Sequence, residues 1–186
     1  MTDYEKICDF QNLLNAHNRA RRSKQHKKDI ILFETNLAQN LWNIKNSLEN
    51  HSYKISGYNK FMIFDPKERE IQVLSYYDRI VQHVLCDEVL SPFFERKLIY
   101  DNAACRTGKG THFALNRLTK FFRQHYKLFG DSGYILKCDI RKYFPSIHHK
   151  VLKEMLTKII PDKKIMDLLL HIIDSFEYSP NRGLHM

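Results

Sequence analysis

The segment "YILKCDIRKYFPSIHH", residues 134–149, places a single carboxylate, Asp139, near the end of an apolar run. Alternate side chains share a face of a strand. Asp139 would then lie on the open face, opposite an apolar face formed by Tyr134, Leu136, Cys138 and Ile140. A carboxylate on a rigid strand end suits a hard cation such as Mg²⁺, which prefers oxygen ligands. Taken in isolation, the residue is better explained as a strand-end acid paired with Lys137 or Arg141.

A second candidate site lies in "YNKFMIFDPKEREIQVLS", residues 58–75, which reads as two short strands around a turn. Asp65-Pro66 opens the turn, because proline presets the backbone angle there. Lys67 and Arg69 are therefore expected at the tip of a hairpin or beside it. Cations at such a tip could close over a triphosphate, although an ordinary charged turn would have the same composition.

Basic residues dominate two further segments. "RARRSKQHKK", residues 19–28, holds six bases in ten residues, and the whole chain has a formal net charge of +9 and a pI of about 9.3. This balance favours a polyanionic partner. Residues 104–111, "ACRTGKGT", bring a lysine between two glycines, but the spacing is not that of a phosphate-binding P-loop. A solvated linker and a helix-entry loop are the alternatives for these two segments.

Several helices must position these residues. Apolar spacing predicts helices over residues 3–20 and 29–49, the second capped by Asp29, and another from residue 76 that Asp78 could cap. A helix is expected to begin at Thr111, and two more lie around residues 149–160 and 163–174. One of the adjacent residues His148 and His149 is expected to cap or pack at the start of the first of these. With one hairpin and one further strand, the fold class is α+β.

Cysteine usage and the N-terminus bear on location. The four cysteines are scattered and form no C-x-x-C pair, which indicates free thiols in a reducing compartment. The N-terminus is acidic rather than signal-like, and no apolar run approaches the about 20 residues of a membrane span. We therefore expect a cytoplasmic protein without a membrane partner.

Taken together and in this order, the motifs resemble those of a reverse transcriptase. "LKCDIRKYFPSIHH" resembles the palm motif that carries the first metal-binding aspartate of that family. "DPKEREI" followed by "YDRIVQHVL" resembles the fingers hairpin and the helix after it, and "LIYDNAACRTGKGTHFAL" resembles the next block of the fingers. The similarity is greatest to bacterial group II intron and diversity-generating retroelement enzymes. It implies a right-hand polymerase architecture with a short antiparallel palm sheet.

The resemblance implies three segments: an N-terminal helical extension with the basic segment (1–56), fingers (57–132) and a partial palm (133–186). It implies that Asp139 and the main-chain carbonyl of Ile140 bind Mg²⁺, or Mn²⁺. It implies that the incoming deoxynucleoside triphosphate contacts Lys67, Arg69 and Phe144, the ring of Phe144 excluding a 2′-hydroxyl. An RNA template and an RNA/DNA hybrid are the implied partners, held by Arg79, Arg106, Gly108, Lys109, Gly110, Arg21, Arg22, Lys24, Lys27 and Lys28. For Arg79 a structural role is an equal alternative.

The sequence departs from the family in two respects: the second acidic motif and the thumb are both missing. Complete palms carry a second acidic motif, Tyr-x-Asp-Asp, and this sequence contains no Asp-Asp pair. One carboxylate in place of three would hold two metal ions poorly. We therefore expect a fragment of a longer RNA-directed DNA polymerase that is inactive alone. A non-catalytic RNA- or DNA-binding module and a template-independent, defence-type relative are the alternatives.

Overall fold

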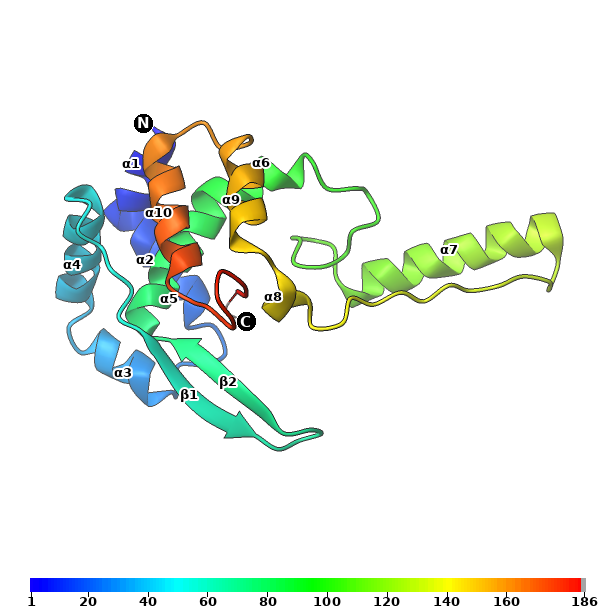
Figure 1. Ribbon diagram of the computed structural model, residues 1–186, viewed down its shortest axis with the longest axis horizontal. Helices are drawn as coiled ribbons and strands as arrows, with labels where there is room; N and C mark the ends of the chain where they lie inside the picture. Colours follow the sequence, from blue (N-terminus) through cyan, green and yellow to red (C-terminus); the bar gives the residue numbers. More distant parts are fainter. Residues whose placement is uncertain (185–186) are drawn as a thin grey trace. The chain divides into compact units, whose positions relative to one another are not determined.

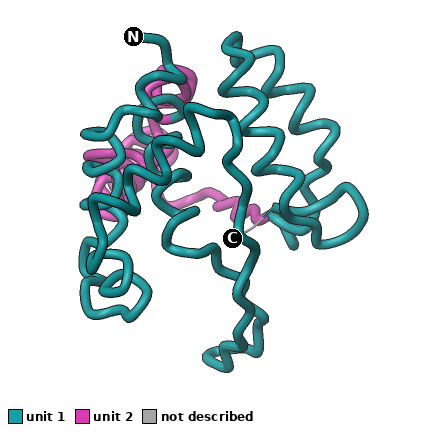
Figure 2. Tube along the Cα trace, turned by 90° about the vertical axis from the view of Figure 1, so that its left-hand side faces the viewer, with its two compact units in different colours: residues 1–90, 141–186 teal, residues 91–140 magenta. Residues whose placement is uncertain are grey.

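The structure, a computed structural model, describes residues 1–184, which form two compact units (Figure 2). Unit 1 comprises residues 1–90 and 141–186, and unit 2 comprises residues 91–140. Unit 2 holds the helices α6 (Ser91–Glu95) and α7 (Thr111–Phe129). Unit 1 holds the remaining elements (Figure 1): α1 (Asp3–Cys8), α2 (Phe10–Ala20), α3 (Lys28–Glu34), α4 (Leu37–Glu49), β1 (Tyr58–Ile63), β2 (Arg69–Leu74), α5 (Tyr76–Leu85), the π-helical turn η1 (Cys86–Leu90), α8 (Tyr143–Ser146), α9 (His149–Thr157) and α10 (Lys163–Asp174).

Two long helices expected from the sequence are each divided. The segment 3–20 breaks at Asp9, whose extended backbone ends α1 and whose carboxylate accepts from the Asn12 N–H at 3.0 Å to cap α2. The segment 29–49 divides between α3 and α4. Asp29 is not the N-cap that we predicted, because α3 begins one residue earlier, at Lys28. Local capping chemistry thus sets helix limits that apolar spacing does not reveal.

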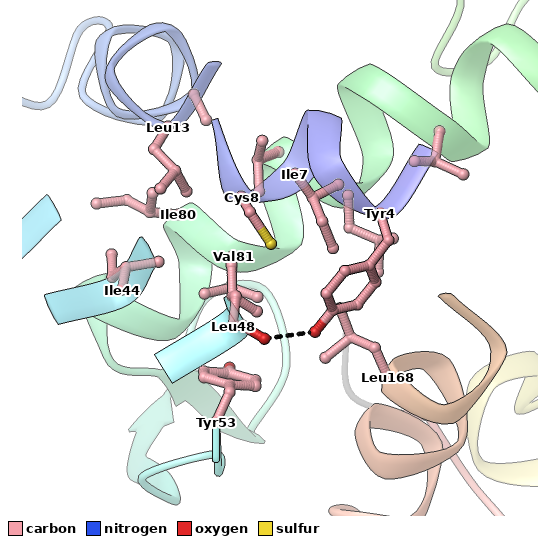
Figure 3. Packing of buried hydrophobic residues seen from close by; sticks show 14 of the residues in the cluster. Tyr4, Ile7, Cys8, Leu13, Ile44, Leu48, Tyr53, Ile80, Val81 and Leu168 are labelled. Atoms are coloured by element: carbon pink, nitrogen blue, oxygen red, sulfur yellow. Dashed lines mark hydrogen bonds between the residues drawn. The ribbon is translucent and has the colours of Figure 1, made fainter. Parts of the chain in front are cut away.

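The core of unit 1 lies between helices from both ends of its sequence. Ile7, Leu13, Ile44, Ile80 and Ile165 have no exposed surface. Four of these residues are seen together in Figure 3, where the Tyr4 hydroxyl also donates to the Leu48 carbonyl at 2.7 Å. Each such buried aliphatic side chain contributes about 1.5–3 kcal/mol. The segment that follows residue 141 is therefore packed with the N-terminal helices.

The predicted hairpin is confirmed. Strands β1 and β2 pair antiparallel, with Tyr58 opposite Leu74 and Ile63 opposite Arg69. Residues 64–68 join the strands at the outer end of the hairpin (Figure 1). Only Leu74, beside α5, is buried. The outer half of the hairpin is therefore accessible to a ligand.

A buried carboxylate anchors the base of this hairpin. Asp78 accepts from the Tyr53 hydroxyl at 2.8 Å, the Ser56 N–H at 3.2 Å and the Ser75 hydroxyl at 2.7 Å. Burial, followed by the nearby Asp78 carboxylate, raises the pKa of Tyr53. Asp78 does not cap α5, as we had expected; Ser75 does, accepting from the Asp78 N–H at 3.1 Å. The acid instead ties the chain before β1 to the start of α5.

The strand predicted from residue 134 is wrong. Residues 132–140 have no regular secondary structure, and within residues 1–184 the only sheet is the β1–β2 hairpin. The implied palm sheet is therefore not present in the described part of the chain. Tyr134 and Leu136 are 105% and 87% exposed. An alternating sequence forms a strand only when a neighbouring strand accepts its backbone hydrogen bonds, and no described segment pairs with this one.

The segment after residue 141 returns to unit 1 through short contacts. The Leu184 N–H donates to the Phe144 carbonyl at 3.1 Å, and the Gly183 N–H donates to the Ile147 carbonyl at 2.9 Å. The buried ring of His149 lies with Nε2 2.6 Å from the Gly183 carbonyl oxygen. His149 is thus the packing residue expected at the start of α9. No helix in the described chain combines the length and apolarity that crossing a bilayer requires.

Candidate functional site

The connection of the β-hairpin presents two cations. Lys67 lies in the connection and Arg69 is the first residue of β2; both side chains are exposed. Neither forms an ion pair with another residue in the range 1–184. One residue further along β2, Glu70 forms a diagonal ion pair across the strands with Lys60, whose Nζ lies 3.3 Å from Oε1. The hairpin thus neutralises one of its cations and leaves the two at the tip available for an anion.

A cavity of about 200 Å³ lies along β2 in the same unit. Its walls come from β2, from α8 and from the segment after α10: Glu70, Ile71, Gln72, Phe144, Pro145, Phe176, Tyr178 and Leu184. The Phe144 ring packs edge to face against Tyr143, with ring centroids 5.3 Å apart, and is 40% exposed. Small-molecule sites usually enclose about 300–1,000 Å³. This cavity therefore suits a sugar or a base rather than a whole nucleotide.

The cavity and the hairpin cations are connected through β2. A strand advances about 3.4 Å per residue, so Arg69 begins about 7 Å from Ile71 along the strand. Lys67 lies two residues further toward the tip. A nucleotide whose sugar lies in the cavity could therefore extend its phosphates along the hairpin toward both cations. The Asp78 anchor fixes the base of this arrangement.

Asp139 is exposed and lies at the end of unit 2, two residues before unit 1 resumes. The chemistry of its carboxylate suits Mg²⁺, and Ile140 follows with an exposed side chain. However, no cluster of three or more His, Cys, Asp or Glu side chains able to hold a metal occurs in residues 1–184. Mg²⁺ is usually bound by one or two carboxylates together with water and substrate phosphates, so a single carboxylate is too few for a pair of metal ions. These residues therefore do not by themselves fit the metal pair that the resemblance implies.

Two of the arginines assigned to nucleic acid, Arg79 and Arg106, form ion pairs inside the protein. Arg79 forms an ion pair with Asp29 and lies over the Tyr76 ring at 5.1 Å. Arg106 has an 8% exposed side chain that pairs with Glu95 and donates to the Ile99 carbonyl at 2.9 Å. This hydrogen-bonded arginine lowers the pKa of Glu95. These contacts give Arg79 and Arg106 structural roles in their own units.

The glycine-flanked lysine is also engaged. Lys109 donates to the Tyr100 carbonyl at 2.6 Å and lies 4.1 Å from the centroid of the Tyr100 ring. Gly108 has φ of +73°, which favours glycine, in a tight turn that pairs Arg106 with Lys109. Gly110 precedes α7 as its N-cap residue. The loop is thus a self-contained turn whose template contact stays a prediction.

The basic segment 19–28 divides into two parts. Arg19 and Arg21 pair with acids of unit 1, and the Nε of Arg21 lies 2.9 Å from Glu34 Oε1. The other four cations are exposed and have no ion-pair partner in the described chain: Arg22, Lys24, Lys27 and Lys28. The binding role predicted for this segment is untested, and only these four have the accessibility that it requires.

Sequence reasoning missed two features. The first is Asp78, whose spacing from Ser75 looks like a helix cap but whose side chain is an anchor. The second is the polar face of α7, where Lys120, Arg123 and Lys127 recur at helical spacing. The complete lack of acids in residues 111–129 was a visible signal for it.

Comparison with known proteins yields a structural likeness. No family model matches the chain, and no curated protein matches it. Among solved structures, a chain of the "Partial Cas6-RT-Cas1--Cas2 complex" matches all of this chain with a TM-score of 0.58 and 20% identity. A chain of the "Cas6-RT-Cas1--Cas2 complex" matches equally well, again over 100% of this chain, with a TM-score of 0.58 and 20% identity. Both complexes contain a reverse transcriptase. The chain has a reverse-transcriptase-like fold. It spans 32% and 20% of the length of those two chains.

Proposed function

We propose that this chain supplies the fingers (57–132) and the first part of the palm (133–186) of an RNA-directed DNA polymerase, after an N-terminal extension (1–56). The parent enzyme would add deoxynucleotides to a primer 3′ end on an RNA template. The observation that carries the proposal is the reverse-transcriptase-like fold, which covers the whole chain. The order of the sequence motifs supports it independently. We further propose that the parent enzyme is of the bacterial group II intron or diversity-generating retroelement type.

In this proposal the hairpin and the adjoining cavity bind the incoming deoxynucleoside triphosphate. Lys67 and Arg69 neutralise phosphate oxygens, with Arg69 able to make a two-pronged contact. The sugar enters the cavity beside Phe144, whose rigid ring leaves no room for an additional 2′-hydroxyl. The close spacing of these groups along β2 supports the assignment, because one nucleotide can reach all of them.

Asp139 is proposed to contribute one Mg²⁺ ligand of the parent enzyme. In a polymerase, the metal ions activate the primer hydroxyl and neutralise the leaving group. The described residues lack the remaining ligands, so no catalytic step is derived from this chain. We expect the 186 residues alone to give no primer extension on poly(rA)/oligo(dT). Robust synthesis that disappears in Asp139→Asn would show this expectation to be wrong.

Photolabelling tests nucleotide binding directly. The full chain is irradiated with a photoreactive deoxythymidine triphosphate, with the template–primer present, and the labelled peptides are identified by mass spectrometry. Label is expected on β2 or residues 143–146, and Lys67→Gln/Arg69→Gln should weaken labelling about 10-fold or more, because two charge-assisted contacts are lost. Lys54→Gln/Lys158→Gln removes the same charge from exposed lysines elsewhere and should change little.

Substitution of Phe144 tests the role of the cavity. Phe144→Ala should raise labelling by the ribonucleotide analogue relative to the deoxyribonucleotide analogue. If neither the Lys67/Arg69 substitutions nor Phe144→Ala changes the labelling, the proposed nucleotide site is wrong.

The proposal competes with a non-catalytic RNA- or DNA-binding module. The observation that favours this alternative is the lack of a metal-binding cluster in residues 1–184. Such a module would bind RNA without any specific photolabelling by the nucleotide. The similar chains belong to assemblies with Cas6, Cas1 and Cas2, so partner proteins are a further class that the parent protein could engage.

A further inference from the structure

Helix α7 has an unusual charge composition. Its 19 residues, THFALNRLTKFFRQHYKLF, contain four lysines or arginines and no aspartate or glutamate. Helices of soluble proteins usually interleave the two signs, since opposite charges three or four residues apart stabilise the helix. No acid within α7 offsets the repulsion among these four cations. An external anion would relieve it.

The cations of α7 lie on one side. With 100° between successive residues, Asn116, Lys120, Arg123 and Lys127 fall within one narrow sector of the helix surface. Thr119 and Gln124 flank that sector. The opposite side carries the apolar residues Leu115, Leu118, Phe121, Phe122, Leu128 and Phe129. The helix is thus divided into a cationic face and an apolar face.

The cationic face is hollowed. A shallow groove of about 540 Å³ runs along it, lined by Asn116, Thr119, Lys120, Arg123, Gln124 and Lys127. Every one of these exposed side chains carries a hydrogen-bond donor, of which the Thr119 hydroxyl donates to the Leu115 carbonyl at 2.9 Å, and none is an acid. No acid in residues 1–184 forms an ion pair with Lys120, Arg123 or Lys127.

Arg117 shows the contrast within the same helix. It lies at the edge of the two faces, pairs with Asp101 and stacks over the Phe121 ring at 4.7 Å. Its charge is therefore used within unit 2. The three cations of the groove are the ones left for a partner.

We propose that this groove of α7 binds the phosphate backbone of a nucleic-acid strand. The inference rests on the proposed function only in taking the polyanion to be nucleic acid. From Asn116 to Lys127 the helix rises about 16 Å, which matches about five phosphates along one strand of a duplex. Phosphate contacts in nucleic-acid complexes come from Lys and Arg together with Asn, Gln and Thr, which is the composition of this groove. Such contacts hold a strand without reading its sequence.

A basic amphipathic helix can also bind an anionic membrane. In that case the apolar face does the binding, and the polar face needs no ordered donors. The uncharged donors that line the groove therefore favour the nucleic acid. The membrane becomes an outcome that the experiment can detect.

The test measures the salt dependence of binding by the full chain to a fluorescein-labelled oligo(U) of about 20 nucleotides, between about 50 and 200 mM salt. The variant is Lys120→Gln/Arg123→Gln/Lys127→Gln. Each lost contact to a single strand lowers the slope of log K against log salt by about 0.7, so the slope should fall by about 2. The Kd of the wild type should then rise roughly 20-fold more across this range than the Kd of the variant.

A matched control separates this effect from net charge. Lys54→Gln/Lys158→Gln/Lys163→Gln removes three exposed lysines from unit 1 and should leave the slope nearly unchanged. Circular dichroism should give the same melting temperature for both variants, since all six side chains are exposed.

A wild-type salt slope in the α7 variant would overturn the proposal, and so would equal slopes in the α7 and control variants. The proposal would also be wrong if the α7 variant bound phosphatidylglycerol vesicles more weakly than the wild type but bound RNA equally well. Competition by poly-glutamate as strong as that by poly(U) would overturn the assignment to nucleic acid. The proposed nucleotide site is judged separately by photolabelling. If the nucleotide site is photolabelled normally but the α7 variant keeps the wild-type salt slope for RNA, only the groove proposal is wrong. If the α7 variant loses the slope but no specific photolabel is found, only the proposed nucleotide site is wrong.

Discussion

Helices α5 and α7 have similar amphipathic sequences and opposite surroundings. In α5, Ile80, Val81 and Val84 have no exposed surface. In α7, no residue is buried, and Leu118 and Phe122 remain 46% and 48% exposed. The difference lies in their neighbours: α5 packs against α2, α3 and α4 within unit 1, whereas within unit 2 the described residues show no comparable packing of α7 against α6. Hydrophobic periodicity therefore predicts which face of a helix is apolar, but not whether the protein covers that face.

The largest expected contrast comes from truncating one apolar side chain in each helix. Ile80→Ala should lower the free energy of unfolding by about 2–5 kcal/mol, because it leaves a cavity in a filled core. Leu118→Ala should change it by less than about 0.5 kcal/mol, because nearly half of the residue is already exposed and no filled core surrounds it. Urea unfolding followed by circular dichroism measures both. Equal losses would mean that the apolar face of α7 is covered in solution.

A smaller contrast is expected between two acids. Asp78→Ala leaves the buried Tyr53 hydroxyl and the partly buried donors of Ser56 and Ser75 without their acceptor, and should cost about 1–3 kcal/mol in the free energy of unfolding. Asp101→Ala breaks the exposed pair with Arg117 and should have a much smaller effect, because water replaces the lost contact. Thermal melts of the two variants compare the effects. A larger loss for Asp101→Ala would contradict the different burial of the two sites.

The smallest expected effect concerns pH. Burial lowers the pKa of His17 below its usual value of 6.5. The Glu34 carboxylate acts in the opposite direction and raises this pKa, whereas the positive charge of Arg21 lowers it further. Its Nδ1 lies 3.0 Å from the Tyr76 hydroxyl. A lowered folded-state pKa means that the unfolded chain binds the proton first, so this contribution to stability is complete above about pH 6.5 and is lost as pH falls below it.

Urea unfolding at pH values between about 7 and 5 measures this loss. His17→Gln should lose less stability over that range than the wild type does. It should retain part of the dependence, because burial also lowers the pKa of His83. His112→Gln, at an exposed position of α7, is the matched control and should follow the wild type. A wild-type pH dependence in His17→Gln would show that the buried ring makes no contribution.

The hairpin, which was predicted correctly, and the strand predicted from residue 134, which does not form, show how far sequence reasoning extends. Residues 58–74 carry both strands and the turn between them, so all the hydrogen-bonding partners lie within one short segment. Residues 134–140 have the same alternation, but a partner strand would have to come from elsewhere in the chain. The hairpin could therefore be predicted locally, and the second strand could not.

The candidate site divides in the same way. The sequence located the cations of the hairpin tip and the exposed carboxylate of Asp139. It did not reveal that Arg79 pairs with Asp29, fifty residues distant in the sequence, or that Arg106 pairs with Glu95. Nor could it show that Phe144 and β2 line one cavity, because contacts between distant segments leave no spacing pattern.

The sequence by itself determined the basic charge, the α+β class and the hairpin with its cations. These depend on residue type and on spacing within one element. Only the tertiary structure decided which cations form ion pairs with acids of the protein, which apolar faces are buried, and that the Asp78 carboxylate anchors the hairpin. Burial and ion pairing depend on which distant segments meet, and in unit 1 the meeting of α1, α4, α5 and α10 is settled by packing rather than by local preference.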